Sequence, residues 1–99
     1  MSPRDLGFRL QDIAERVLRV QRAQHLLRSA EEQNSPELFE VSFDAILYGL
    51  IVIGEAVRSL PSDFLEQHPQ IPWSKIIGIR NLLSHEYFRV DGALVRATL

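Results

Sequence analysis

Residues 45–54 read A-I-L-Y-G-L-I-V-I-G, the longest apolar run of the chain. The run follows Ser35-Pro36, where serine suits a helix N-cap and proline suits the first helical position. We therefore predict a helix that starts here and ends before Pro61. A helix that is apolar all round is buried on every side, and the other helices of so small a domain can hardly cover it. The run therefore predicts a homodimer, in which a second copy covers this helix.

The remaining segments also follow helical patterns. Ser2-Pro3 repeats the start signal, and a stripe of apolar residues at alternating spacings of four and three follows it as far as residue 20. This first helix is expected to break at residues 31–34. A short third helix is expected from Pro61 to about residue 67, and a fourth from Trp73 to Leu83. Asp91-Gly92 would cap a last segment, which is marginal as a helix alone and could belong to a longer one.

No segment alternates between apolar and polar residues with a period of two. We therefore predict an all-α protein, an up-and-down bundle of four main helices with a fifth begun. Residues 1–99 are expected to form a single domain. Gly49, Gly54 and Gly78 lie inside the predicted helices, where each costs about 1 kcal/mol relative to alanine. Tight packing against another helix would explain all three glycines.

Composition narrows the classes of function. The formal net charge of −2 differs from that of a strongly basic nucleic-acid binder, although arginines at positions 9, 16, 19 and 22 lie off the apolar stripe. They form either a solvated helix face or a phosphate-binding strip. The chain has no cysteine, which excludes disulfides and thiolate metal sites and fits a reducing cytoplasm. The apolar run is shorter than the ~20 residues that span a bilayer, and the N-terminus does not resemble a secretory signal. We expect a cytoplasmic protein without a membrane partner.

Residues 80–91 read R-N-L-L-S-H-E-Y-F-R-V-D and carry the candidate site. Arg80 presents a planar fork of donors to phosphate oxygens. His85 can take and give a proton near neutral pH. Tyr87 has a hydroxyl that can donate, accept or be modified.

Structural interpretations of the same residues remain open at this point. His85 could cap a helix end, Arg80 could pair with Glu86 or another acid, and Tyr87 could close the core. The other candidates are weaker. Ser84 lacks a base to activate it, His25 and His68 lack metal-ligand spacing, and Trp73 is expected in the core rather than as a base-stacking platform.

Three blocks resemble one family. They are residues 50–56 (L-I-V-I-G-E-A), 68–73 (H-P-Q-I-P-W) and 77–91, which begins I-G-I-R-N. Together they resemble the HepT-like proteins of the HEPN superfamily, the toxins of HEPN/MNT type VII toxin–antitoxin pairs. Arg80, His85 and Tyr87 match the family motif RX4HXY. The chain departs from many relatives at Tyr48, where they have a basic residue, and at Ile51, where they have glutamate.

The resemblance implies all-helical homodimers that cut RNA without a metal or cofactor, in a cleft lined by both subunits. It implies catalytic roles for Arg80 and His85 and a supporting role for Asn81. The partner would be an MNT-type nucleotidyltransferase antitoxin, which neutralises the toxin by transferring AMP to Tyr87. That tyrosine could also contact substrate. The alternative is a catalytically inactive HEPN dimer that binds a partner or a nucleotide.

The spacing of the motif agrees with a dimeric site. On a regular helix Arg80 and His85 point about 140° apart, whereas Arg80 and Tyr87 lie within about 20° of each other. Asn81 is the neighbour of His85 one turn earlier, where it could orient His85 or help to cap the helix. Two motifs that face each other across a two-fold axis would bring two arginines and two histidines into one cleft.

Overall fold

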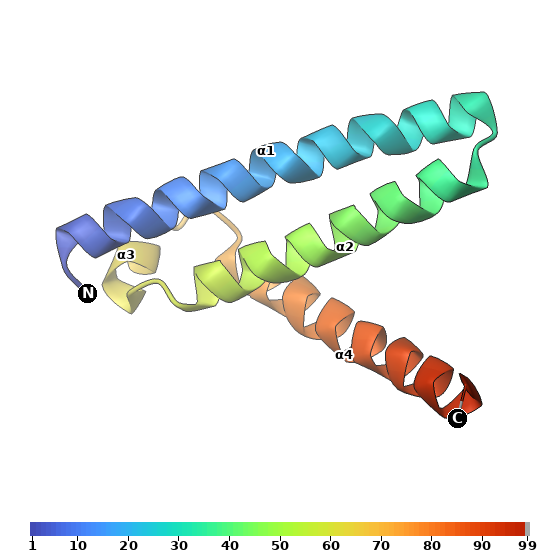
Figure 1. The fold of residues 1–99 in the computed structure, drawn as a ribbon. Helices are drawn as coiled ribbons and strands as arrows, with labels where there is room; N and C mark the ends of the chain where they lie inside the picture. The colour runs from blue at the N-terminus through green and yellow to red at the C-terminus, as the bar shows by residue number, and fades with distance from the viewer. Residues whose placement is uncertain (99) are drawn as a thin grey trace.

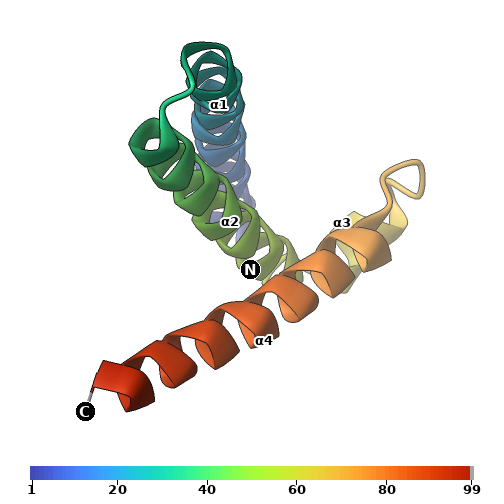
Figure 2. The same ribbon diagram turned by 90° about the vertical axis from the view of Figure 1, so that its right-hand side faces the viewer.

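The computed structural model describes the backbone of residues 1–98 and the side chains of residues 1–85. This part of the chain contains four helices and no strand, so the all-α prediction is confirmed. The helices are α1 (Pro3–Gln33), α2 (Pro36–Arg58), α3 (Ser62–Glu66) and α4 (Trp73–Thr98). The first two lie side by side and antiparallel, and α4 crosses the end of α2 and points away from the pair (Figures 1 and 2).

The predicted start signals are confirmed in atomic detail. The Ser2 hydroxyl accepts a hydrogen bond from the backbone N–H of Asp5 at 3.1 Å, and the Ser35 hydroxyl accepts one from Leu38 at 3.3 Å. Each serine thus satisfies one of the free N–H groups at its helix start. Between the two helices, Asn34 adopts a left-handed conformation with a φ of 52°. This conformation ends α1 and allows α2 to fold back along it.

Helix α4 differs from the prediction. It was expected to end at Leu83, with Asp91-Gly92 capping a separate last segment, but it continues from Trp73 to Thr98 without interruption. The segment that was expected to begin a fifth helix is therefore the end of α4. A glycine lowers helix stability by only about 1 kcal/mol, so one aspartate–glycine pair does not by itself end a helix. His85 consequently lies within a helix and not at its end.

Trp73 anchors the start of α4 against the preceding connection. Its indole N–H lies 3.1 Å from the carbonyl oxygen of Leu65 and 3.0 Å from that of His68. Its ring lies beside Phe64, with 6.3 Å between the ring centroids. These contacts agree with the structural interpretation of Trp73.

Two of the three glycines that the sequence analysis singled out mark close helix contacts. A Cβ on Gly49 would collide with the Val20 side chain of α1, and a Cβ on Gly54 would collide with the Arg80 side chain of α4. The expectation of tight packing is confirmed at these two positions. Within one chain it does not hold for Gly78, which is exposed and has no neighbouring side chain of the described residues within 4 Å of where a Cβ would lie.

The single chain buries little apolar surface. The buried apolar side chains among those described are Val20, Ala23, Ala30, Val57 and Leu60. The accessible surface is 7500 Å², whereas a compact chain of this mass exposes about 5,800 Å². The radius of gyration is 16.2 Å, against about 13 Å for a compact domain of this length. Helix α2 leaves Val41, Phe43 and Tyr48 exposed, so the chain's own helices do not cover it. The homodimer stays a prediction.

None of the helices in the described part of the chain combines the length and the apolar character needed to cross a membrane.

Candidate functional site

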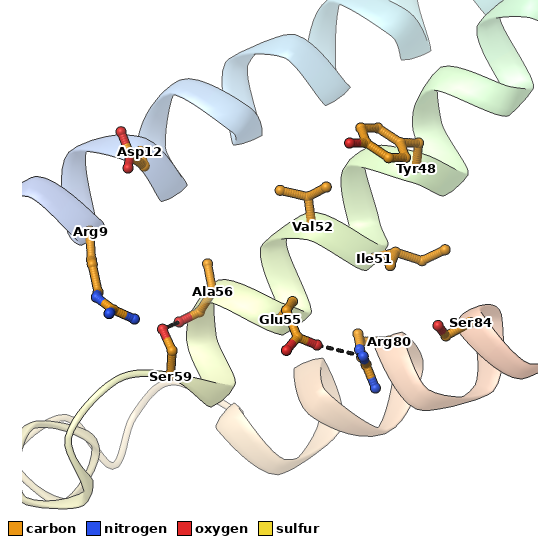
Figure 3. Close-up of a pocket in the computed structure, with 10 residues that line it drawn as sticks. All are labelled: Arg9, Asp12, Tyr48, Ile51, Val52, Glu55, Ala56, Ser59, Arg80 and Ser84. Carbon is orange, nitrogen blue, oxygen red and sulfur yellow. Dashed lines mark hydrogen bonds and ion pairs between the residues drawn. The ribbon is translucent and has the colours of Figure 1, made fainter.

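Arg80 lies where α4 crosses α2. Its side chain packs over Gly54, and its guanidinium forms an ion pair with Glu55, with 2.5 Å between Nη2 and Oε2 (Figure 3). Nη1 donates a hydrogen bond to Oδ1 of Asn81 at 2.9 Å. The Arg80 side chain is 23% exposed and that of Glu55 is 58% exposed. Residues from two helices therefore fix the arginine, whose side chain stays partly exposed.

Arg80 forms part of the wall of an open pocket of about 790 Å³. One face of α2 forms its centre, since residues 48, 51, 52, 55 and 59 follow helical spacing. Helix α1 contributes two charged residues and α4 contributes the remainder of the opposite wall (Figure 3). The lining residues are Arg9, Asp12, Tyr48, Ile51, Val52, Glu55, Ala56, Ser59, Arg80 and Ser84.

The charges of this pocket balance. Arg9 and Arg80 are opposed by Asp12 and Glu55, and Ile51 with Val52 makes the middle of the pocket apolar. A phosphate that approaches Arg80 would compete with Glu55, whose exposed carboxylate can turn away into water. The Nε atom of Arg80 is buried and has no hydrogen-bond partner among the described residues. One N–H of the guanidinium therefore remains without a hydrogen-bond partner inside the described structure.

The described chain does not bring Arg80 and His85 together. Ser84 lines the pocket but His85 does not, and His85 is exposed on another side of α4. Its neighbour three residues earlier, Leu82, is 62% exposed. Asn81 contacts Arg80, although it was expected to orient His85 or to cap the helix. The acid that pairs with Arg80 comes from α2 and is Glu55.

The Tyr87 and Glu86 side chains lie outside the described ones, so the expected place of Tyr87 beside Arg80 stays a prediction. Its backbone belongs to α4. Within the described part of the chain, no three His, Cys, Asp or Glu residues are grouped so that they could hold a metal ion.

Sequence reasoning did not identify the pocket residues Glu55, Tyr48 and Asp12 as parts of the site. Glu55 did belong to one of the blocks that resemble the HepT-like proteins, and Tyr48 stood out as a departure from them. These two features were the available signals in the sequence. Neither of them indicates that α2 crosses α4, and it is this crossing that brings Glu55 to Arg80.

Curated relatives match about half of the chain. A protein of Caldanaerobacter subterraneus subsp. tengcongensis named "Putative RNase" is 44% identical over 55 residues, which cover 56% of this chain and 49% of the relative. A protein of Methanocaldococcus jannaschii with the same description is 43% identical over 51 residues, covering 52% of this chain and 47% of the relative. The "Probable ribonuclease HepT" of Thermococcus cleftensis is 45% identical over 47 residues, which cover 48% of this chain and 43% of the relative.

The chain thus spans about half the length of the curated relatives that it matches. No solved structure matches it. The model of the family described as "Ribonuclease HepT-like" matches residues 9–99, which include α2, the Arg80 pocket and all of the motif. The chain therefore belongs to the HepT-like family of the HEPN superfamily.

Proposed function

We propose that the protein is a HepT-type endoribonuclease, the toxin of a HEPN/MNT pair, with a cleft built by two copies of the chain. The observation that carries the proposal is the separation of its two reactive groups. Arg80 is fixed at the wall of an open pocket, whereas His85 faces solvent on another side of α4. One chain presents Arg80 and His85 on different surfaces. A second copy can bring its own His85 to the Arg80 of the first.

The proposed reaction needs no group beyond those of the motif and the RNA. The 2′-hydroxyl attacks the adjacent phosphorus, and the bond from phosphorus to the 5′-oxygen breaks. One His85 takes the proton of the 2′-hydroxyl, and the His85 of the second copy gives a proton to the leaving 5′-oxygen. Arg80 stabilises the added negative charge on the phosphate oxygens. The products are a 2′,3′-cyclic phosphate and a 5′-hydroxyl.

Expression of the chain in a bacterial host, beside Arg80→Ala and His85→Ala, tests the function. We expect growth arrest and RNA degradation from the chain alone. With purified protein, cleavage of single-stranded RNA should continue in EDTA and should leave a 2′,3′-cyclic phosphate detectable by mass spectrometry. An RNA with one 2′-deoxynucleotide at the cut position should stay intact, since it has no 2′-hydroxyl to attack. Equal toxicity of the chain and both variants would contradict a nuclease.

The second candidate is a catalytically inactive HEPN dimer that binds a partner or a nucleotide. Two features of the pocket favour it. Glu55 neutralises Arg80, and Ile51 presents an apolar side chain beside it. Under this alternative, the purified chain forms its dimer and binds its partner but leaves RNA intact in every buffer.

A further inference from the structure

Tyr48 occupies an unusual position between two hollows of the surface. It lines the 790 Å³ pocket of Arg80 and also a second, smaller hollow of about 160 Å³, which Arg16 and Arg19 of α1 help to form. The tyrosine is 59% exposed although it lies in the middle of α2. In Figure 3 its ring stands at the end of the pocket beyond Ile51, on the side away from Glu55.

Arg16 occupies one face of the tyrosine ring. The central guanidinium carbon of Arg16 lies 5.5 Å from the ring centroid, a distance that allows a cation–π interaction. Gly49, the next residue of α2, lets α1 approach closely enough for this contact. Because the residue is more than half exposed with one face of its ring covered, the other face is open to a further flat group.

An open aromatic face beside arginines is the arrangement that binds single-stranded nucleic acid, in which bases stack and phosphates meet cations. Among the described side chains the single ion pair is that of Arg80 with Glu55, so Arg16 and Arg19 are free of acidic partners there. A second copy that covered Tyr48 with apolar side chains would also have to cover these unpaired charges, which is costly. RNA phosphates would complement them.

We propose that Tyr48 and Arg16 form a base-stacking subsite for single-stranded RNA beside the phosphate bound at Arg80. The inference rests on the proposed ribonuclease function and adds a substrate contact to it. Tyr48 and Glu55 are seven residues apart on α2, which places the ring about 10 Å along the helix from the Arg80 contact. One stacked base step is only ~3.4 Å long. The stacked base therefore lies about three stacked steps along the strand, and does not belong to the nucleotide whose phosphate is attacked.

Equilibrium binding tests the subsite without interference from cleavage. The parent protein is His85→Ala, which keeps the RNA intact, and the probe is a fluorescein-labelled single-stranded RNA of ten nucleotides followed by anisotropy at fixed salt. Tyr48→Leu removes the aromatic face but keeps an apolar side chain, and should weaken binding about 5- to 140-fold. Tyr48→Phe keeps the face and should bind as the parent does. Phe43→Leu, another exposed ring of α2 outside both hollows, is the matched control.

A second measurement separates stacking from a merely structural effect. Single abasic sites are placed in turn along the RNA. At one position the loss of the base should weaken binding to the parent and to Tyr48→Phe, while Tyr48→Leu, already without a stacking partner, should be insensitive at every position. Static light scattering on all variants reports their oligomeric state.

Three results would overturn the subsite, and they differ from one another. If the parent does not bind RNA, the subsite and the proposed ribonuclease function both fail. If the parent binds and Tyr48→Leu binds equally well, the subsite alone fails. If Tyr48→Leu loses RNA binding together with dimerisation, the ring is a contact between two copies of the chain.

Discussion

Gly54 and Glu55 are neighbours on α2 that act on the same side chain of α4. Gly54 permits the close approach of Arg80, and Glu55 holds its guanidinium. A methyl group on Gly54 would lie 2.6 Å from the Arg80 Cγ and 3.4 Å from its Cα, so part of α4 would have to move. Gly54→Ala should therefore lower the free energy of unfolding by about 1–3 kcal/mol, as other overpacked contacts do. It should also weaken RNA cleavage.

Urea denaturation followed by circular dichroism measures this change, with Gly7→Ala as the control. Gly7 lies in α1, and no side chain of the described residues lies within 4 Å of where its Cβ would be. The control should equal or exceed the stability of the unmodified chain, because alanine favours a helix over glycine. Equal stabilisation by both substitutions would mean that α2 and α4 do not meet closely at Arg80.

Modification of Tyr87 is predicted to switch off RNA binding at Arg80. Tyr87 lies seven positions after Arg80, so a continuous α4 places the two within about 20° of each other around the helix axis. AMP on the tyrosine would bring a phosphate to the arginine and block RNA there. Incubation with the cognate nucleotidyltransferase and ATP should add one or more AMP units, seen by intact-mass spectrometry. Tyr87→Phe should stay unmodified, and modification of both proteins to the same extent would exclude this tyrosine as the acceptor.

The sequence indicated the candidate residues but not their contacts. Arg80 and His85 were identified from a motif of residues close together in the chain. The ion pair of Arg80 with Glu55 joins positions 25 residues apart and depends on how two helices cross. The spacing of apolar residues within either helix does not predict the angle at which α2 and α4 cross. The divergence of Arg80 and His85 was predictable, because it follows from the geometry of a single helix.

At the scale of the element, the helix starts were predicted well and one helix end was not. Ser2-Pro3 and Ser35-Pro36 act through local hydrogen bonds, which a sequence displays directly. The end of α4 was misplaced because its apolar pattern was followed only to Leu83 and Asp91-Gly92 was interpreted as the cap of a new segment. A long helix tolerates glycine wherever its other residues continue the pattern, since the penalty is small and local.

Gly78 provides a test of this account of α4. It is exposed inside the helix, and among the described residues a methyl group there would meet no neighbouring side chain. Gly78→Ala should therefore raise the free energy of unfolding by up to about 1 kcal/mol. Thermal denaturation at several protein concentrations measures it. Destabilisation that grows as the protein is concentrated would show instead that a second copy packs closely against this residue.

At the scale of the whole molecule, the open shape of the chain explains why a second copy is expected. Helix α4 projects away from the α1–α2 pair (Figure 2), and the chain exposes more surface than a compact domain of its size. The apolar run of α2 predicted that the other helices of the chain would leave part of α2 exposed. Sequence alone did not predict which of its side chains stay exposed, because that depends on where α1 and α4 lie.

The last prediction concerns the dimer and its dependence on Leu82. Leu82 is exposed on α4, one turn from His85, so a second copy that covered it would also face that histidine. Leu82→Glu would place a charge in this contact, where burying it without a partner is costly. We expect light scattering at micromolar concentration to give twice the chain mass for the unmodified protein and a monomer for Leu82→Glu. The variant should retain its helical circular dichroism and lose RNA cleavage.

The control is Leu26→Glu, at an equally apolar exposed position on α1, which should keep both the dimer and the cleavage. A Leu82→Glu monomer that still cuts RNA would show that one chain holds the complete site, and a well-folded monomer of the unmodified protein would exclude the composite cleft altogether.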